Sequence, residues 1–157
     1  MDTPLVGVDG GTSPNPVTDR DHVPDPGRVD AVGAADVRTI SLVSGLGRMA
    51  IGVGLVLAPR QALGALGFRD VPDQAMVVSR IAGGRDFVLG ALTLLAIDDP
   101  DRLRTAHLAC AAVDAGDAAA FGAALAQGGD LRAAGVRGLA TAVPATLAGV
   151  WAALRLR

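Results

Sequence analysis

The chain has 157 residues, enough for one domain of ordinary size, and a formal net charge of −2, which excludes the basic surface that nucleic-acid-binding proteins present to phosphates. Half of the residues are hydrophobic, only 3% are aromatic, 21 are glycine, and every basic residue is an arginine. The single cysteine, Cys110, excludes an intrachain disulfide and a cysteine-based metal cluster. Polar residues crowd into the N-terminal part and a few connections, so the remaining chain is far more apolar than a typical soluble domain.

The first 37 residues are rich in proline, glycine, aspartate and threonine, and they contain no periodic apolar face. Such a segment cannot bury enough apolar surface to offset its conformational entropy, so we expect residues 1–37 to be a disordered tail. The acidic start, interrupted by prolines, also lacks the features of a secretory signal, and we expect no cleaved signal peptide. Residues 38–157 are expected to form one membrane domain.

The first long apolar segment covers residues 39–58, contains one charge, Arg48, and is stopped by Pro59. About 20 residues at a rise of 1.5 Å match the roughly 30 Å hydrocarbon layer of a bilayer, so this length predicts a transmembrane helix. Residues 59–69 are too few to span, and we expect them to form a short helix lying at the membrane surface.

The second apolar segment begins after Pro72 and continues to Ile97, interrupted by Arg80, Arg85 and Asp86. A short acidic turn follows, in which an aspartate can cap the next helix and Pro100 can occupy its first turn. Because this connection is tight, the second and third helices are expected to be antiparallel neighbours.

The third segment, residues 104–126, is rich in alanine and carries His107, Asp114 and Asp117, which makes it the weakest expected span. His107 lies near the start of this helix and is expected at the membrane interface. The fourth segment, residues 131–154, contains Pro144, which membrane helices tolerate as a kink. The pattern therefore predicts an all-α fold, a four-helix transmembrane bundle behind a disordered N-terminal tail.

The long segments lack the continuous polar face that a soluble helical bundle needs, which favours the membrane interpretation over a soluble helical oligomer. Arginines near the segment ends show a small bias, which places both termini on the cytoplasmic side of the cell membrane. Those on the side of the termini are Arg38, Arg102, Arg104, Arg155 and Arg157, and those on the other side are Arg60, Arg69, Arg132 and Arg137.

Six charged residues fall inside the predicted spans, three of each sign: Arg48, Arg80, Arg85, Asp86, Asp114 and Asp117. A charge near the centre of a membrane helix costs roughly 2.5 to 3.5 kcal/mol, so these six are expected to pair in the bundle interior. On the first helix Ser41, Gly45, Arg48 and Gly52 share a stripe, and on the second Ser79, Gly83, Asp86 and Gly90 do. We expect Arg48 to pair with Asp114 or Asp117, and small residues to allow close helix approach.

This network has two interpretations. In the first, its charges form interhelical ion pairs that fix the packing and register of the helices. The protein is then a structural or accessory membrane protein that packs against itself or another membrane protein. In the second, they line a polar cavity that binds a small molecule, a proton or a quinone-like headgroup. The first predicts that every interior charge is paired, and the second predicts at least one unpaired aspartate. No catalytic motif is present, and we expect neither an enzyme nor a cofactor.

A metal site formed by His107, Cys110, Asp114 and Asp117 is not expected, because these residues spread over about 15 Å along one helix.

The chain resembles, over about residues 38–155, the small bacterial four-helix membrane proteins of domain of unknown function 4267, which share their layout with DoxX-like proteins. The resemblance is carried by Gly-Leu-Gly-Arg at 45–48, Leu-Ala-Pro-Arg at 57–60, Arg-Ile-Ala-Gly-Gly-Arg-Asp-Phe-Val-Leu-Gly at 80–90 and Val-Asp-Ala-Gly-Asp at 113–117, of which Gly-Gly-Arg-Asp and Asp-Ala-Gly-Asp are the most specific parts. It implies a four-span membrane fold, and by analogy with DoxX-like layout an association with respiratory or redox membrane complexes.

Overall fold

The computed structural model describes the backbone of residues 26–156 and the side chains of residues 36–156. Within that part the chain is all-helical, without strands, as predicted. Its elements in order are α1 (Pro26–Leu57), α2 (Pro59–Leu66), α3 (Asp73–Leu95), α4 (Pro100–Gln127), the short 3-10 helix η1 (Gly129–Leu131) and α5 (Arg132–Arg155).

The helix α1 begins earlier than the predicted end of the tail at residue 37. Most of the predicted tail, residues 1–25, lies outside the described residues, but α1 already starts at Pro26. Proline is well suited to the first turn of a helix, and no further proline occurs before Pro59. Helix α1 therefore begins within the predicted tail, because a segment with little apolar surface can still continue a helix that is stabilised further along.

The short helix α2 has Pro59 in its first turn and ends at Gly67, whose φ of 99° lies in the left-handed region that favours glycine. The Gly67 N–H donates to Gly64 O and the Phe68 N–H to Leu63 O, which closes the helix with a C-terminal cap. Eight residues are too few to cross a bilayer, as expected for this segment.

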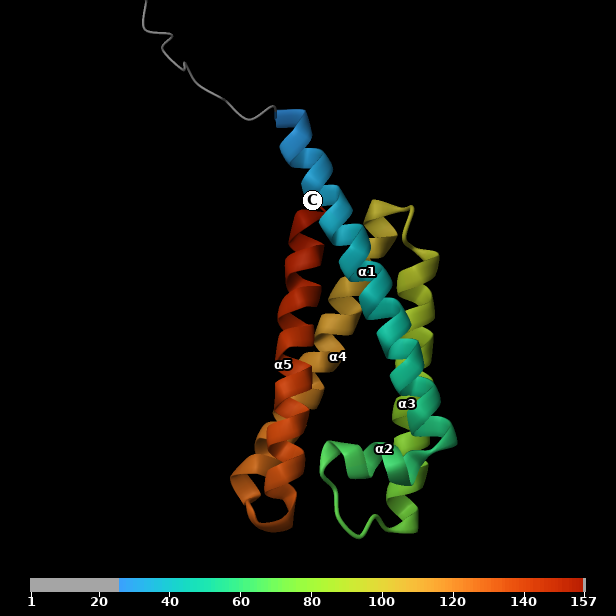
Figure 1. Cartoon of the computed structure of the whole chain (residues 1–157), viewed down its shortest axis with the longest axis vertical. Coiled ribbons are helices and arrows are strands. Elements are labelled where there is room, and N and C mark those ends of the chain that lie inside the picture. The colour runs from blue at the N-terminus through green and yellow to red at the C-terminus, as the bar shows by residue number, and fades with distance from the viewer. Residues whose placement is uncertain (1–25, 157) are drawn as a thin grey trace, which may run out of the picture.

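The long helices form two hairpins (Figure 1). The first hairpin consists of α1 packed against α3, and the second consists of α4 packed against α5. The hairpins meet near the C-terminus, which we call the closed end, where Val37, Ala96, Leu103 and Ala152 from all four helices form a buried cluster. They diverge toward the open end, where α2 lies across the molecule (Figure 1).

Glycines set the packing within each hairpin. A Cβ atom placed on Gly52 would lie 2.6 Å from Gly83 O, and one on Gly90 would lie 2.5 Å from Gly45 O. In the second hairpin, a Cβ on Gly135 would lie 2.6 Å from Leu125 N. The backbones therefore approach more closely than any larger residue would allow, which is typical of helix pairs in membranes.

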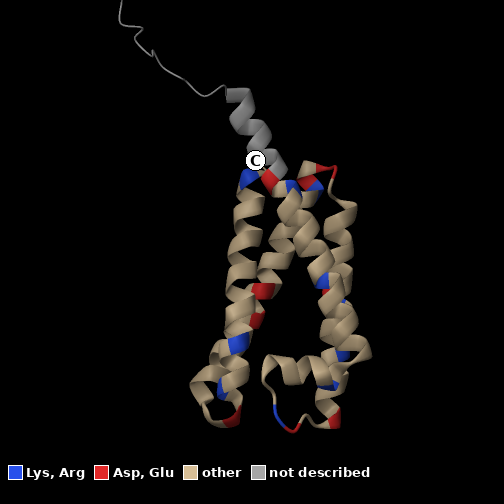
Figure 2. Ribbon diagram, in the orientation of Figure 1, with Lys and Arg blue, Asp and Glu red and all other residues tan. Residues whose placement is uncertain are grey.

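The burial pattern is the reverse of that in a soluble bundle. Buried positions are mainly Ala, Gly, Ser and Thr, whereas large aliphatic side chains face outward, among them Leu57 at 77% and Leu95 at 83% exposure. Charged residues gather at the two ends and in one group between them (Figure 2). Such a large apolar exterior requires a covering of lipid or protein.

Three helical segments are long and apolar enough to cross a membrane: Asp36–Leu57, Pro100–Gln127 and Gly129–Arg155. The expectation that residues 104–126 give the weakest span is therefore wrong, because α4 qualifies and α3 does not. Every 18-residue stretch of α3 contains Arg80, Arg85 and Asp86, and these charges lower its mean hydropathy.

Candidate functional site

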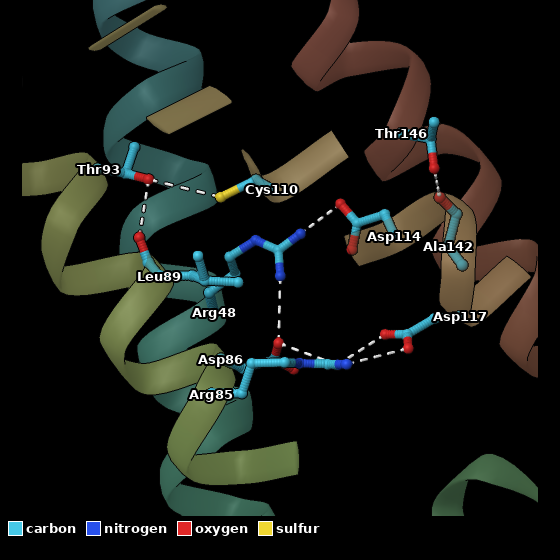
Figure 3. Close-up of polar contacts among 10 residues, drawn as sticks. All are labelled: Arg48, Arg85, Asp86, Leu89, Thr93, Cys110, Asp114, Asp117, Ala142 and Thr146. Carbon is cyan, nitrogen blue, oxygen red and sulfur yellow. Dashed lines mark hydrogen bonds and ion pairs between the residues drawn. The ribbon is translucent and has the colours of Figure 1, made fainter. Parts of the chain in front are cut away.

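The charge network joins the two hairpins about halfway along the molecule (Figure 3). Arg48 on α1 donates through Nη2 to Asp114 Oδ2 on α4 and through Nη1 to Asp86 Oδ1 on α3, the latter at 3.2 Å. Both side chains of the Arg48–Asp114 pair are only 10% exposed. The contact between Arg48 and Asp114 is one of the two pairs expected from the stripes of the first and third predicted spans, the other being Arg48 with Asp117.

The network continues through Arg85 on α3. Its Nη2 donates to Asp117 Oδ2 at 2.8 Å and its Nη1 donates to Asp117 Oδ1 at 3.2 Å, so Arg85 and Asp117 on α4 form a bidentate ion pair. The same Nη2 lies 3.3 Å from Asp86 Oδ1. Asp86 therefore accepts from both arginines, and the order of contacts is Asp114, Arg48, Asp86, Arg85 and Asp117.

The close glycine contacts of the first hairpin position two members of this network. Arg48 lies three residues after Gly45 and four before Gly52, and Asp86 has the same spacing from Gly83 and Gly90. Residues at these spacings share one face of a helix, so the face that brings α1 against α3 also brings Arg48 to Asp86. On α4, Asp114 and Asp117 lie about one turn apart and each reaches one arginine.

The network is unbalanced in charge and exposure. It contains three carboxylates and two guanidinium groups, a formal net charge of −1 when all are ionised. The Arg85 and Asp117 side chains are 37% and 35% exposed, whereas Arg48 and Asp114 are buried. In addition, Arg85 Nε is buried without a hydrogen-bond partner.

Arg80, which we expected in the interior, lies outside the network. Its side chain is exposed, and its Nε donates to Val56 O at 3.3 Å on the outer surface of the first hairpin. Arg80 precedes Arg85 by five residues, a rotation of about 140° around the helix, so both cannot face the second hairpin. The expectation that all six charges pair in the interior, which rested on three charges of each sign, is thus wrong.

A buried polar layer lies between the network and the closed end. Ser41 Oγ lies 2.8 Å from His107 Nε2, and Thr93 Oγ1 lies 3.7 Å from Cys110 Sγ (Figure 3 shows the second contact). His107 is 1% exposed, so its expected interfacial position was wrong. The sequence contained one indication of this buried layer. Ser41 shares a stripe with Arg48 and lies two turns before that interior charge, so Ser41 should face the interior as well.

Within residues 36–156, no three His, Cys, Asp or Glu side chains come together in a way that could hold a metal ion. His107 contacts Ser41, but no carboxylate contact of His107 is seen that would complete a nucleophilic triad. The arrangement of the network suits charge pairing between helices, or exchange of a proton or a small cation at its exposed end.

Comparison of the chain with protein-family models, with curated proteins and with solved structures gives no match. The resemblance to four-helix bacterial membrane proteins thus stays a prediction. All five network residues, Arg48, Arg85, Asp86, Asp114 and Asp117, lie within its motifs, which also contain Arg60 and Arg80 outside the network.

Proposed function

We propose that the chain is a four-span cell-membrane protein in which α1, α3, α4 and α5 cross the bilayer, α2 lies at its surface, and both termini are cytoplasmic. The observation that carries this proposal is the reversed burial pattern. It extends to α3, where Val77, Val78, Ile81 and Leu92 are all more than half exposed. Arg85 and Asp86 turn inward, and Arg80 is exposed near the start of α3, so the middle of its outer face carries no charge, which a span can tolerate.

The proposed role of the charge network is to hold the two hairpins together in a structural or accessory membrane protein. All three network aspartates contact an arginine, and the contacts of Asp114 and Asp117 cross from one hairpin to the other. In lipid no water is available to solvate these groups, so separating the hairpins would expose charges at a cost of several kcal/mol. The family resemblance, and with it a second copy or a redox membrane complex as partner, belongs to this proposal.

Membrane extraction tests the placement. Cells that express a C-terminally tagged copy are fractionated, and the membranes are washed with high salt and then with carbonate. A four-span protein stays in the pellet until detergent is added. Release by carbonate would overturn the proposal and would indicate a soluble helical oligomer that covers its apolar exterior by self-association.

A second candidate function, binding of a proton or a small cation by the network, is favoured by its net charge of −1 and by the partial exposure of Asp117. The detergent-solubilised protein is unfolded by heat in sodium, potassium and choline chloride at equal ionic strength. This candidate requires that one cation, or low pH, raises the melting temperature and that Asp117→Asn removes the effect. Equal melting temperatures under all conditions would refute it.

A further inference from the structure

A pocket of about 440 Å³ opens at the open end, away from the charge network. Its lining comes from the loop after α2, from η1 and from the first two turns of α5: Arg69, Gly129, Asp130, Arg132, Ala133, Val136 and Arg137. The pocket therefore lies where the loop between α2 and α3 meets the turn between α4 and α5.

Two contacts fix the walls of this pocket. Arg137 Nη1 on α5 donates to Ala65 O in the last turn of α2 at 2.9 Å. Gly67, the cap of α2, lies so close to α5 that a Cβ there would be 3.0 Å from the Ala133 carbonyl carbon. The end of α2 is thus held against the start of α5 by one side-chain hydrogen bond and by a close backbone approach at Gly67.

The pocket concentrates positive charge. It is lined by three arginines and one aspartate, a formal net charge of +2. Some arginines at the ends of the helices pair with aspartates, as Arg60 does with Asp73 at 2.8 Å and Arg38 with Asp98 at 2.8 Å. Arg69 and Arg132, in contrast, form no ion pair with any residue in the described part of the chain, Asp130 included.

We propose that this pocket binds the phosphate headgroup of an anionic phospholipid. Guanidinium groups match phosphate oxygens in charge and geometry, and none of the three here forms an ion pair within the described residues; Arg137 donates only to the neutral Ala65 carbonyl. The assignment rests on the proposed membrane placement, because that placement puts the open end at the level of the headgroups. Ala133 and Val136, which is 51% exposed, then offer an apolar wall to the lipid beside its phosphate.

The test uses the full chain in detergent micelles that contain either phosphatidylglycerol or phosphatidylcholine, and it measures bound lipid by native mass spectrometry. The variant Arg69→Gln/Arg132→Gln removes two of these guanidinium groups and leaves Arg137, which contacts Ala65. The variant Arg102→Gln/Arg155→Gln removes the same charge from exposed positions at the closed end and is the matched control. A basic residue at an anionic lipid surface contributes about a fivefold gain in affinity, so we expect phosphatidylglycerol to bind roughly twentyfold more weakly to the first variant.

Preferential binding of phosphatidylglycerol by the wild type and by the control, with loss in the first variant, supports the proposal. Equal binding by all three proteins would overturn it. Inorganic phosphate is added as a competitor in a separate series, and displacement of the lipid at low phosphate would show a site for free phosphate instead. Folding of the variants is checked by circular dichroism. A failure of the membrane proposal is distinguishable, since it would show beforehand as release of the protein by carbonate.

Discussion

At the residue scale, Asp114 and Asp117 are chemically identical but differ in their surroundings. Asp114 pairs with a buried arginine, whereas Asp117 pairs with one that is more than a third exposed. Removal of one partner from a buried ion pair leaves the other charge unsolvated, and that penalty is much smaller where water or headgroups can reach the group.

We therefore expect Asp114→Asn to destabilise the protein by about 3 kcal/mol and Asp117→Asn by less than about 1 kcal/mol. The measurements are the folded yield after detergent extraction and the melting temperature of each variant. Asparagine keeps the shape of the side chain, so the difference reports charge. Similar yields from both would count against a structural role for the Asp114 ion pair with Arg48.

Arg48→Leu provides a second comparison at this scale. It leaves Asp114 without its arginine, but Asp86 retains Arg85. We expect a loss of folded protein that is largely restored in the double variant Arg48→Leu/Asp114→Leu, because an apolar pair can replace a buried ion pair at little cost. A double variant destabilised by the sum of the effects of Arg48→Leu and Asp114→Leu would show that the two residues act independently.

At the element scale, the glycine contacts of the first hairpin decide how close α1 and α3 can come. A Cβ placed on Gly83 would meet Gly52 O and Leu55, whereas a Cβ placed on its neighbour Gly84 would have nothing within 4 Å. Alanine substitutions at these two positions therefore distinguish the effect of helix packing on stability from the effect of helix propensity.

We expect Gly83→Ala to destabilise the first hairpin by about 1 to 3 kcal/mol, because the new methyl group would lie 2.6 Å from Gly52 O and force the backbones apart. Gly84→Ala is expected to be neutral or to stabilise by up to about 1 kcal/mol, since alanine is the better helix former. Thermal unfolding in detergent measures both. A neutral Gly83→Ala would mean that the helices tolerate a wider separation.

The helical segments and the interior position of Arg48, Asp86 and Asp114 could be predicted, because each follows from periodicity within one helix. The start of α1 could not, since the pattern marks apolar surface and not helix propensity. The exclusion of Arg80 needed the direction from which the second hairpin approaches α3, and no single-helix pattern contains that direction. The pairing of Arg85 with Asp117 and the burial of His107 likewise depend on how the hairpins dock.

At the scale of the whole molecule, the two hairpins are held by different means at different heights. The closed end has a small apolar cluster around Leu103 and Ala152, the middle has the charge network, and the open end has α2 and the contact of Arg137 with Ala65. The network is thus one of three links between the hairpins below the closed end, beside the polar layer of Ser41 and His107 and the contact of α2 with α5.

We expect Arg48→Gln to let the hairpins move apart at the open end only. Spin labels at Gln74 and Ala126 report on the open end, and labels at Leu95 and Leu154 report on the closed end; all four positions are exposed. The distance distribution measured by pulsed electron paramagnetic resonance, in a Cys110→Ser background, should broaden for the first pair and stay unchanged for the second. Unchanged distributions for both pairs would show that α2 alone holds the open end.

The division of charge between the hairpins has a consequence for biogenesis. The first hairpin contributes Arg48, Arg85 and Asp86, a sum of +1, and the second contributes Asp114 and Asp117, a sum of −2. In the proposed membrane placement, the ribosome delivers the first hairpin before the second, so the first hairpin would enter the bilayer with one network cation that has no counter-charge yet. Each half should therefore insert poorly when it is expressed alone and well when it is expressed together with the other half. Two separately translated halves should protect each other from degradation.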